Sequence, residues 1–140
     1  MSMLERNWNY YDGEYVDATY LNGKVVKEIE NDLEEMWFKL EDDSEVLMYH
    51  SQDCCEDVQI EDICGDLDDL IGYPLKVVES ISNEREGVEC YESCTWTFYR
   101  LSTQKGTVVI RWFGESNGYY SESVDFRKFD AKGEDDGKTK

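Results

Sequence analysis

The sequence predicts an α+β domain, in which a twisted antiparallel sheet forms a meander and one main amphipathic helix packs on it. Three observations predict this fold. Several short runs alternate apolar and polar residues, one segment repeats apolar residues at helical spacing, and turn-forming residues separate the runs. At 140 residues, with 40% hydrophobic and 14% aromatic residues, the chain suits one folded domain.

Three parts of the chain differ in pattern. Residues 1–22 are aromatic but poorly patterned, which fits an N-terminal arm or an edge strand. Residues 23–129 carry the regular runs and form the expected single α+β domain. Residues 130–140 are charged and contain glycine without an apolar anchor, so we expect a disordered tail.

The first strands are expected directly after Asn22-Gly23, which is a turn signal. Residues 24–30 alternate apolar and polar types, residues 36–40 are rich in aromatics, and residues 46–49 follow a second turn. This order predicts three consecutive antiparallel strands.

The main helix is expected over the segment that follows. Its apolar residues recur at helical spacing: Ile60, Ile63, Cys64, Leu67, Leu70 and Ile71. Gly72, with Pro74 two residues later, would end such a helix. Gly65 is costly inside a helix, which suggests that another backbone approaches it closely.

The C-terminal half predicts an antiparallel meander. Strand-like runs cover residues 75–81, 94–101, 107–113 and 119–126. Asn117-Gly118 between the last two runs is a strong hairpin signal.

The charge is concentrated in one region of the chain. The formal net charge is -19, and residues 28–69 hold seventeen acidic residues against Lys39 alone. Such a field repels nucleic acids and membrane surfaces and attracts basic proteins. Direct nucleic-acid or membrane binding is therefore not expected.

The cysteines indicate neither a disulfide framework nor a zinc site. Five is an odd number, no signal peptide or membrane-spanning run is present, and no pair has the C-x-x-C spacing. We expect free thiols, no metal and no cofactor.

The first candidate site surrounds the single histidine, between an expected strand and the helix. Its residues are His50, Asp53, Cys54, Cys55 and Glu56. A thiol nucleophile activated by His50 and a metal site are both conceivable. Neighbouring side chains on an extended strand face opposite ways, however, so a hydrogen-bonded loop that caps the helix is the favoured interpretation.

The second candidate site is the expected C-terminal hairpin. Arg111 and Trp112 precede Asn117 and Tyr120, and arginine beside aromatics can hold a phosphate or a base. Alternatively, the aromatics stabilise the hairpin and the arginine pairs with a carboxylate. A third set, Asp62, Asp66, Asp68 and Asp69, is expected to form an acidic, solvated surface rather than a calcium site.

Four segments resemble an uncharacterised family of small domains from bacteriophage and prophage genomes. They are residues 49–56 (YHSQDCCE), 60–72 (IEDICGDLDDLIG), 95–99 (TWTFY) and 110–122 (IRWFGESNGYYSE), and the similarity spans residues 46–126. The resemblance implies no activity; it implies a phage-encoded accessory protein in the host cytoplasm. It also favours a shared site at the two candidate segments.

Two functions follow as hypotheses. The first is a non-enzymatic anti-defence inhibitor, of the anti-CRISPR or anti-restriction type, whose acidic surface binds a basic nuclease or guide-RNA effector. The second is a protein that binds or sequesters a nucleotide signal with the His50 loop and the Arg111 hairpin. An enzyme with thiol or metal chemistry at His50 is a weaker alternative, and the sequence leaves a homo-oligomer open.

Overall fold

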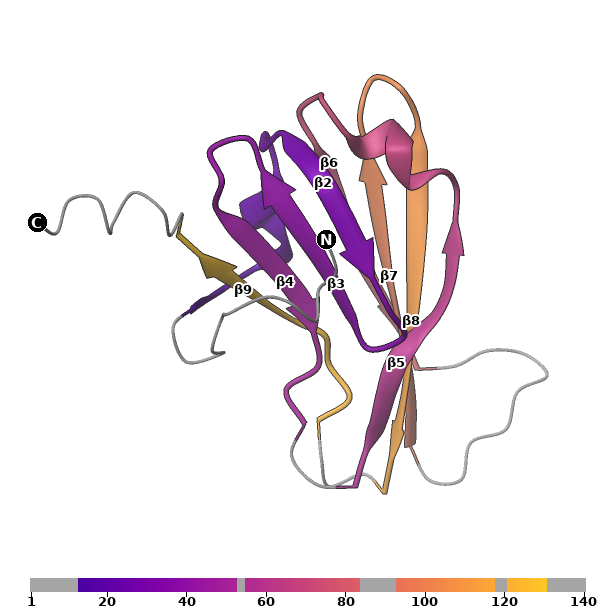
Figure 1. The fold of residues 1–140 in the computed structure, drawn as a ribbon. Coiled ribbons are helices and arrows are strands. Elements are labelled where there is room, and N and C mark those ends of the chain that lie inside the picture. The colour runs from indigo at the N-terminus through magenta and orange to yellow at the C-terminus, as the bar shows by residue number, and fades with distance from the viewer. Residues whose placement is uncertain (1–12, 53–54, 84–92, 118–120, 131–140) are drawn as a thin grey trace, which may run out of the picture.

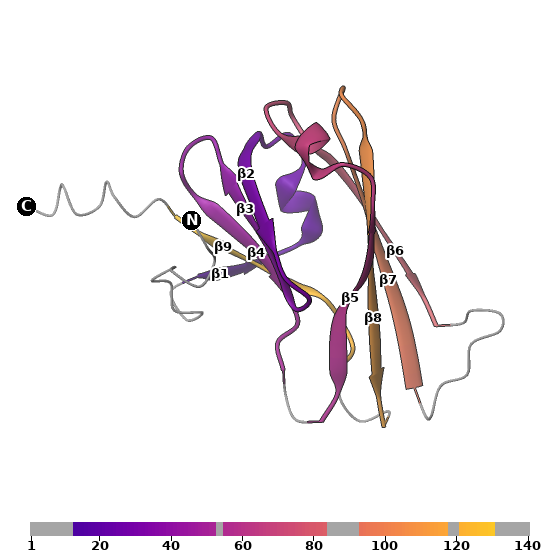
Figure 2. The same ribbon diagram turned by 45° about the vertical axis from the view of Figure 1, so that its right-hand side comes forward.

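Two antiparallel β-sheets face each other as the layers of a sandwich (Figures 1 and 2). The structure, a computed structural model, describes residues 13–52, 55–83, 93–117 and 121–130. The first sheet has the strand order β1-β9-β4-β3-β2, and the second has the order β5-β8-β7-β6. The elements are β1 (Glu14–Val16), η3 (Ala18–Leu21), β2 (Val26–Asn31), β3 (Glu35–Leu40), β4 (Glu45–Tyr49), β5 (Asp57–Cys64), η4 (Leu67–Leu70), β6 (Lys76–Ser82), β7 (Ser93–Ser102), β8 (Thr107–Ser116) and β9 (Asp125–Phe129), where η marks a short 3-10 helix.

The first sheet contains the three consecutive antiparallel strands that the sequence predicts. β2 pairs with β3 and β3 with β4, and Phe38 is paired with Ile29 on one side and Val46 on the other. Phe38 and Val46 are fully buried in the core between the sheets. β9 then pairs with β4, and β1 adds to β9 as an edge strand, which is one of the two arrangements expected for the N-terminal segment.

The second sheet contains the predicted strands of residues 75–81, 94–101 and 107–113 as β6, β7 and β8. β7 lies between the other two and is buried on both faces. Tyr99 and Leu101 point into the core, whereas Trp96 packs on Phe113 with ring centroids 5.0 Å apart. The alternation predicted for this strand is confirmed.

The predicted α+β class is wrong, because the molecule is all-β. No helix of seven residues or more occurs among the described residues, and the segment predicted as the main helix forms β5 and η4 instead. The helix-like spacing of the apolar residues in this segment has a local cause. Ile60 pairs with Trp112, but the next paired residue is Asp62, opposite Arg111, so Glu61 is the extra residue of a β-bulge. The bulge turns strand alternation into the three-residue step from Ile60 to Ile63, which resembles helical spacing.

Gly65 ends β5 in a conformation that a helix does not have. Its φ is +122°, and a Cβ at this position would lie 2.7 Å from the carbonyl oxygen of Thr107 and 3.0 Å from Cα of Val108. The predicted close approach of another backbone is therefore confirmed. Gly72, with φ +95°, follows η4 and is not the cap of a long helix.

The predicted hairpin at Asn117-Gly118 is also wrong. β8 pairs with β5 and β7, whereas β9 pairs with β4 and β1 in the other sheet. β8 therefore has neighbours on both sides, and the chain crosses to the first sheet, where Phe126 joins the core.

The two sheets are joined along one side of the sandwich. The amide of Ile60 in β5 donates to the carbonyl oxygen of Leu33, in the turn between β2 and β3, at 2.8 Å. Gly72 donates to Val26 in the same way at 2.9 Å. Within the described ranges, no helix is long and apolar enough to cross a membrane.

Candidate functional site

His50 forms a buried pair with Glu56. It follows β4, and its Nδ1 lies 2.7 Å from the carbonyl oxygen of Ser123, while its Nε2 lies 2.7 Å from Oε2 of Glu56. The two side chains are 3% and 0% exposed. Because a carbonyl oxygen only accepts, Nδ1 donates to Ser123, and Nε2 shares a hydrogen bond with the carboxyl group of Glu56. Both ring nitrogens are therefore engaged in hydrogen bonds, and neither is available as a base.

The predicted free thiols are wrong for two of the cysteines. Cys55, at the start of the chain into β5, and Cys94, in β7, are each disulfide-bonded. Cys64 is free and exposed. A disulfide sulfur has no thiolate to act as a nucleophile, so the thiol chemistry considered for Cys55 has no basis in the structure.

The rest of the His50 loop is only partly described. Asp53 and Cys54 lie outside the described residues. The interpretation that this loop caps a helix is wrong, because it leads into β5. Gln52 instead donates from its side chain to the carbonyl oxygen of Glu56 at 2.7 Å, so the loop is hydrogen-bonded internally.

Arg111 and Trp112 do not form one binding site for a phosphate or a base. Arg111 donates from Nε to Oε1 of Glu61 at 2.6 Å, and its Nη1 lies 3.9 Å from Oδ2 of Asp62. Trp112 points to the opposite face, is 1% exposed, and donates to the sulfur of Met48. This is the alternation of a strand, and it confirms the interpretation in which the arginine pairs with carboxylates.

The turn residues predicted beside Arg111 are also apart from it. Asn117 is exposed just after β8, and Tyr120 lies outside the described residues. Along β5, Arg111 is opposite Asp62, whereas the end of β5 near the His50 loop is opposite Glu115. The two predicted sites therefore do not merge in the described part of the chain.

A cavity of about 600 Å³ opens beside His50. Its walls come from β1, β3, β4, β5, β9 and the His50 loop. The residues that line it are Tyr15, Glu34, Glu35, Tyr49, His50, Ser51, Gln52, Glu56, Asp57, Val58 and Arg127.

Arg127 is the cation of this cavity, and the sequence reasoning missed it. The residue is 8% exposed, donates to the hydroxyl of Tyr49 at 3.2 Å and to the carbonyl oxygen of Gly13 at 2.8 Å, and lies 4.0 Å from the ring centre of Tyr15. Within the described residues it makes no ion pair with a carboxylate. The expected strand stopped at residue 126, but extending its alternation would have placed Arg127 beside Phe129 on one face.

The pKa values of the two tyrosines in the cavity are shifted in opposite directions. Hydrogen bonds with Tyr49 and Ser51 lower the pKa of Tyr15, and the charge of Arg127 adds to this effect. Burial raises the pKa of Tyr49. The cavity thus holds a cation and hydroxyl groups at one wall and carboxylates at another.

The predicted acidic surface lies along β5 and η4. Asp62, Asp66 and Asp68 are exposed and Asp69 is half-buried. Asp66 accepts from the amide of Asp68 at 3.0 Å and so caps η4. No three His, Cys, Asp or Glu side chains in the described part of the chain are placed to hold a metal ion.

Comparison with known proteins identifies the family. The model of a family described as a domain of unknown function, DUF7448, matches residues 19–126. The chain belongs to this family. No curated protein and no solved structure matches the chain. The DUF7448 match starts at η3, ends in β9, and includes both the His50–Glu56 pair and Arg111; Arg127 lies one residue beyond it.

Proposed function

We propose that this DUF7448 protein is a phage-encoded, non-enzymatic inhibitor that acts in the host cytoplasm, where its acidic surface binds a basic nucleic-acid-handling protein. One observation carries the proposal. The hydrogen bond between Ile60 and Leu33 places the carboxylates of the β2–β3 turn next to those of β5. We call the exposed carboxylates of this region the acidic edge: Asp32, Glu34, Asp57, Glu61, Asp62, Asp66 and Asp68.

The acidic edge suits a surface that normally holds DNA or RNA. A row of carboxylates on a rigid sheet edge presents negative charge at fixed spacing, and a basic groove pairs with such a row. Arg111 contacts the edge through Glu61 and Asp62, so its charge offsets only part of the row. The resemblance to phage domains supports a nuclease or guide-RNA effector as the partner.

Charge on an edge strand also has a purely structural use, since it prevents sheets from joining edge to edge. Variants that reverse charge but keep the fold separate the structural role from the binding role. Glu34→Lys with Asp62→Lys reverses two exposed charges of the acidic edge. Glu28→Lys with Glu41→Lys is the matched control, because it changes the net charge equally at exposed positions outside the edge.

The test is DNA cleavage by purified restriction nucleases and guide-RNA effectors, with and without the protein. We expect stoichiometric inhibition that weakens as salt rises, because salt screens exposed charges. The edge variant should inhibit about tenfold less well than the control variant. Equal inhibition by the two variants, or no inhibition of any tested enzyme, would contradict the proposal.

A second function is favoured by Arg127. A buried guanidinium facing a cavity, without a carboxylate partner in the described residues, is a suitable partner for a phosphate. In this alternative the cavity beside His50 sequesters a nucleotide signal, with Arg127 in the role that the sequence suggested for Arg111.

Titration calorimetry with adenosine monophosphate tests the second function. Arg127→Met should abolish binding, while Arg111→Met, a change on the outer face of the second sheet, should leave it unchanged. An equal heat of binding for both variants would exclude the cavity as a nucleotide site. No heat of binding for the unmodified protein would exclude it as well.

A further inference from the structure

The outer edge of β6 is only partly paired. In this strand the odd-numbered residues direct their backbone groups away from β7, as two contacts show. Leu75, just before β6, donates to the carbonyl oxygen of Lys24 at 2.9 Å, and the amide of Val77 donates to Oδ1 of Asn22 at 2.7 Å. Glu79 and Ile81 continue this series, and their outward N–H and C=O groups have no partner among the described residues.

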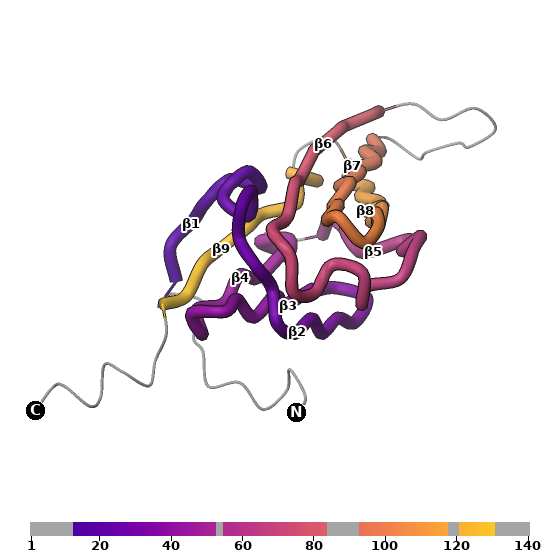
Figure 3. Tube along the Cα trace, turned by 90° about the horizontal axis from the view of Figure 1, so that it is seen from above, coloured from indigo at the N-terminus to yellow at the C-terminus, as the bar shows by residue number. Residues whose placement is uncertain are grey.

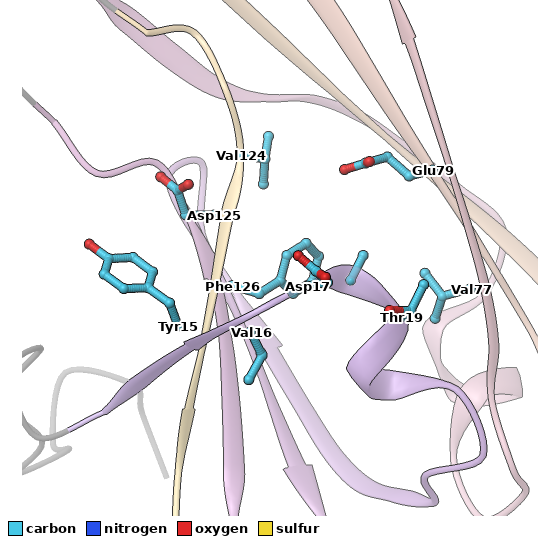
Figure 4. Close-up of a pocket in the computed structure, with 10 residues that line it drawn as sticks. Tyr15, Val16, Asp17, Thr19, Val77, Glu79, Val124, Asp125 and Phe126 are labelled. Atoms are coloured by element: carbon cyan, nitrogen blue, oxygen red, sulfur yellow. The ribbon is translucent and has the colours of Figure 1, made fainter.

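A groove runs beside this open edge, between the two sheets. It consists of two adjoining cavities of about 360 and 350 Å³, and Glu79 and Val124 line both. Figure 3 shows the molecule from above, with β9 in the first sheet and β6 in the second. Figure 4 shows Glu79 reaching from β6 toward Val124, with Asp125 and Asp17 on the facing segments.

The walls of the groove are acidic. Four carboxylates line it, and no lysine or arginine does so among the described residues: Asp17, Glu79, Glu122 and Asp125. Glu122 is buried and accepts from Thr95 and Ser116, whereas Asp17 and Glu79 are exposed to the groove entrance. Ile81 adds an apolar side chain that is 60% exposed.

We propose that an extended, basic segment of the partner docks on β6 as an additional strand. Its backbone pairs with the outward groups of Glu79 and Ile81, and its alternate lysine or arginine side chains enter the groove toward Asp17 and Glu79. This inference rests on the proposed function and gives the same basic partner a second contact, at the edge of the sheet opposite β5. A second copy of this chain, with its net charge of -19, is disfavoured as the occupant.

Amide hydrogen exchange with a synthetic peptide tests the proposal. The probe is a peptide of alternating lysine and threonine, and the control peptide alternates glutamate and threonine. Adding the basic peptide should slow exchange of the Glu79 and Ile81 amides about tenfold. Binding that protects neither amide, absence of binding, or protection of both amides by self-association without peptide would each overturn the inference.

Two variants at one position separate the backbone from the side chain. Ile81→Pro removes the outward N–H without removing a bond to β7, and Ile81→Thr keeps that N–H while removing the apolar side chain. The peptide should bind Ile81→Pro about tenfold more weakly than Ile81→Thr. Equal affinity would overturn the inference.

Failure of this inference is distinguishable from failure of the proposed function. If the unmodified protein inhibits an effector and Ile81→Pro inhibits it equally well, the acidic edge acts without β6. If the unmodified protein inhibits no effector, the proposed function itself is wrong, whatever the peptide does.

Discussion

Two pairs of a basic and an acidic side chain in this molecule have almost the same geometry and opposite surroundings. His50 and Glu56 lie 2.7 Å apart with side chains that are 3% and 0% exposed. Arg111 and Glu61 lie 2.6 Å apart with side chains that are 26% and 38% exposed. The distance between the atoms therefore does not determine what each pair contributes; burial does.

The difference assigns separate roles to the two regions. The buried pair joins the end of β4, the start of β5 and the segment that leads into β9, so it stabilises the end of the sandwich where the chain crosses between sheets. The exposed pair lies in the acidic edge, where water screens it and its groups remain accessible to a partner. The buried pair therefore contributes to stability, whereas the exposed pair lies in the surface proposed for binding.

The largest effect is expected from breaking the buried pair. His50→Ala removes the ring that bonds both the buried Glu56 carboxyl group and Ser123, and we expect a loss of about 3–5 kcal/mol in the free energy of unfolding. Urea denaturation of the variant and the unmodified protein measures this loss. The double variant His50→Leu with Glu56→Met replaces both groups by apolar ones and should be more stable than His50→Ala alone. A double variant that is no better would mean that burying the Glu56 carboxyl group without the imidazole is not the source of the loss.

The pair of Tyr99 and Glu79 is intermediate between the buried and the exposed pair. Tyr99 is fully buried, and its hydroxyl donates to Oε2 of Glu79, which is exposed, at 2.6 Å. Burial, together with Glu79, raises the pKa of Tyr99 far above its usual value. The folded protein therefore keeps this proton at a pH where the unfolded chain releases it, and stability falls as the pH rises above about 10.

Urea denaturation between pH 9 and pH 11 measures this effect. Tyr99 should contribute a loss of about 1.4 kcal/mol per pH unit above pH 10, and Tyr99→Phe should remove that part of the slope. The hydrogen bond to Glu79 is lost in the same variant at all pH values, so only the slope is diagnostic. An unchanged slope would show that Tyr99 ionises as easily in the folded protein as in the unfolded chain.

The sequence predicts correctly the strands that alternate and those that are apolar throughout. β8 alternates buried and more exposed residues, whereas all five residues of β4 are buried. The sequence predicts a helix in place of β5 because one bulged residue, Glu61, changes the spacing of the apolar residues. The prediction of a hairpin at Asn117 is wrong for another reason. A local turn signal does not encode which sheet the next strand joins.

The candidate site was predictable only where its parts are close in sequence. His50 and Glu56 are six positions apart, and the sequence predicts both. Ser123, which fixes the other ring nitrogen, is 73 positions from His50, and Arg127 is 78 positions from Tyr49. Such contacts follow from the crossing between sheets, and a local pattern carries no information about them.

The smallest effect on stability is expected at the exposed pair. Arg111→Gln removes the cation that contacts Glu61 and Asp62, and we expect the free energy of unfolding to change by less than about 1 kcal/mol, with a difference that shrinks at high salt. Urea denaturation at low and high salt measures both quantities. The carboxylates that remain gain negative potential, so the same variant should inhibit a basic effector at least as well as the unmodified protein. A loss of stability as large as that of His50→Ala would break the comparison, because burial could then no longer explain why two pairs of equal geometry differ.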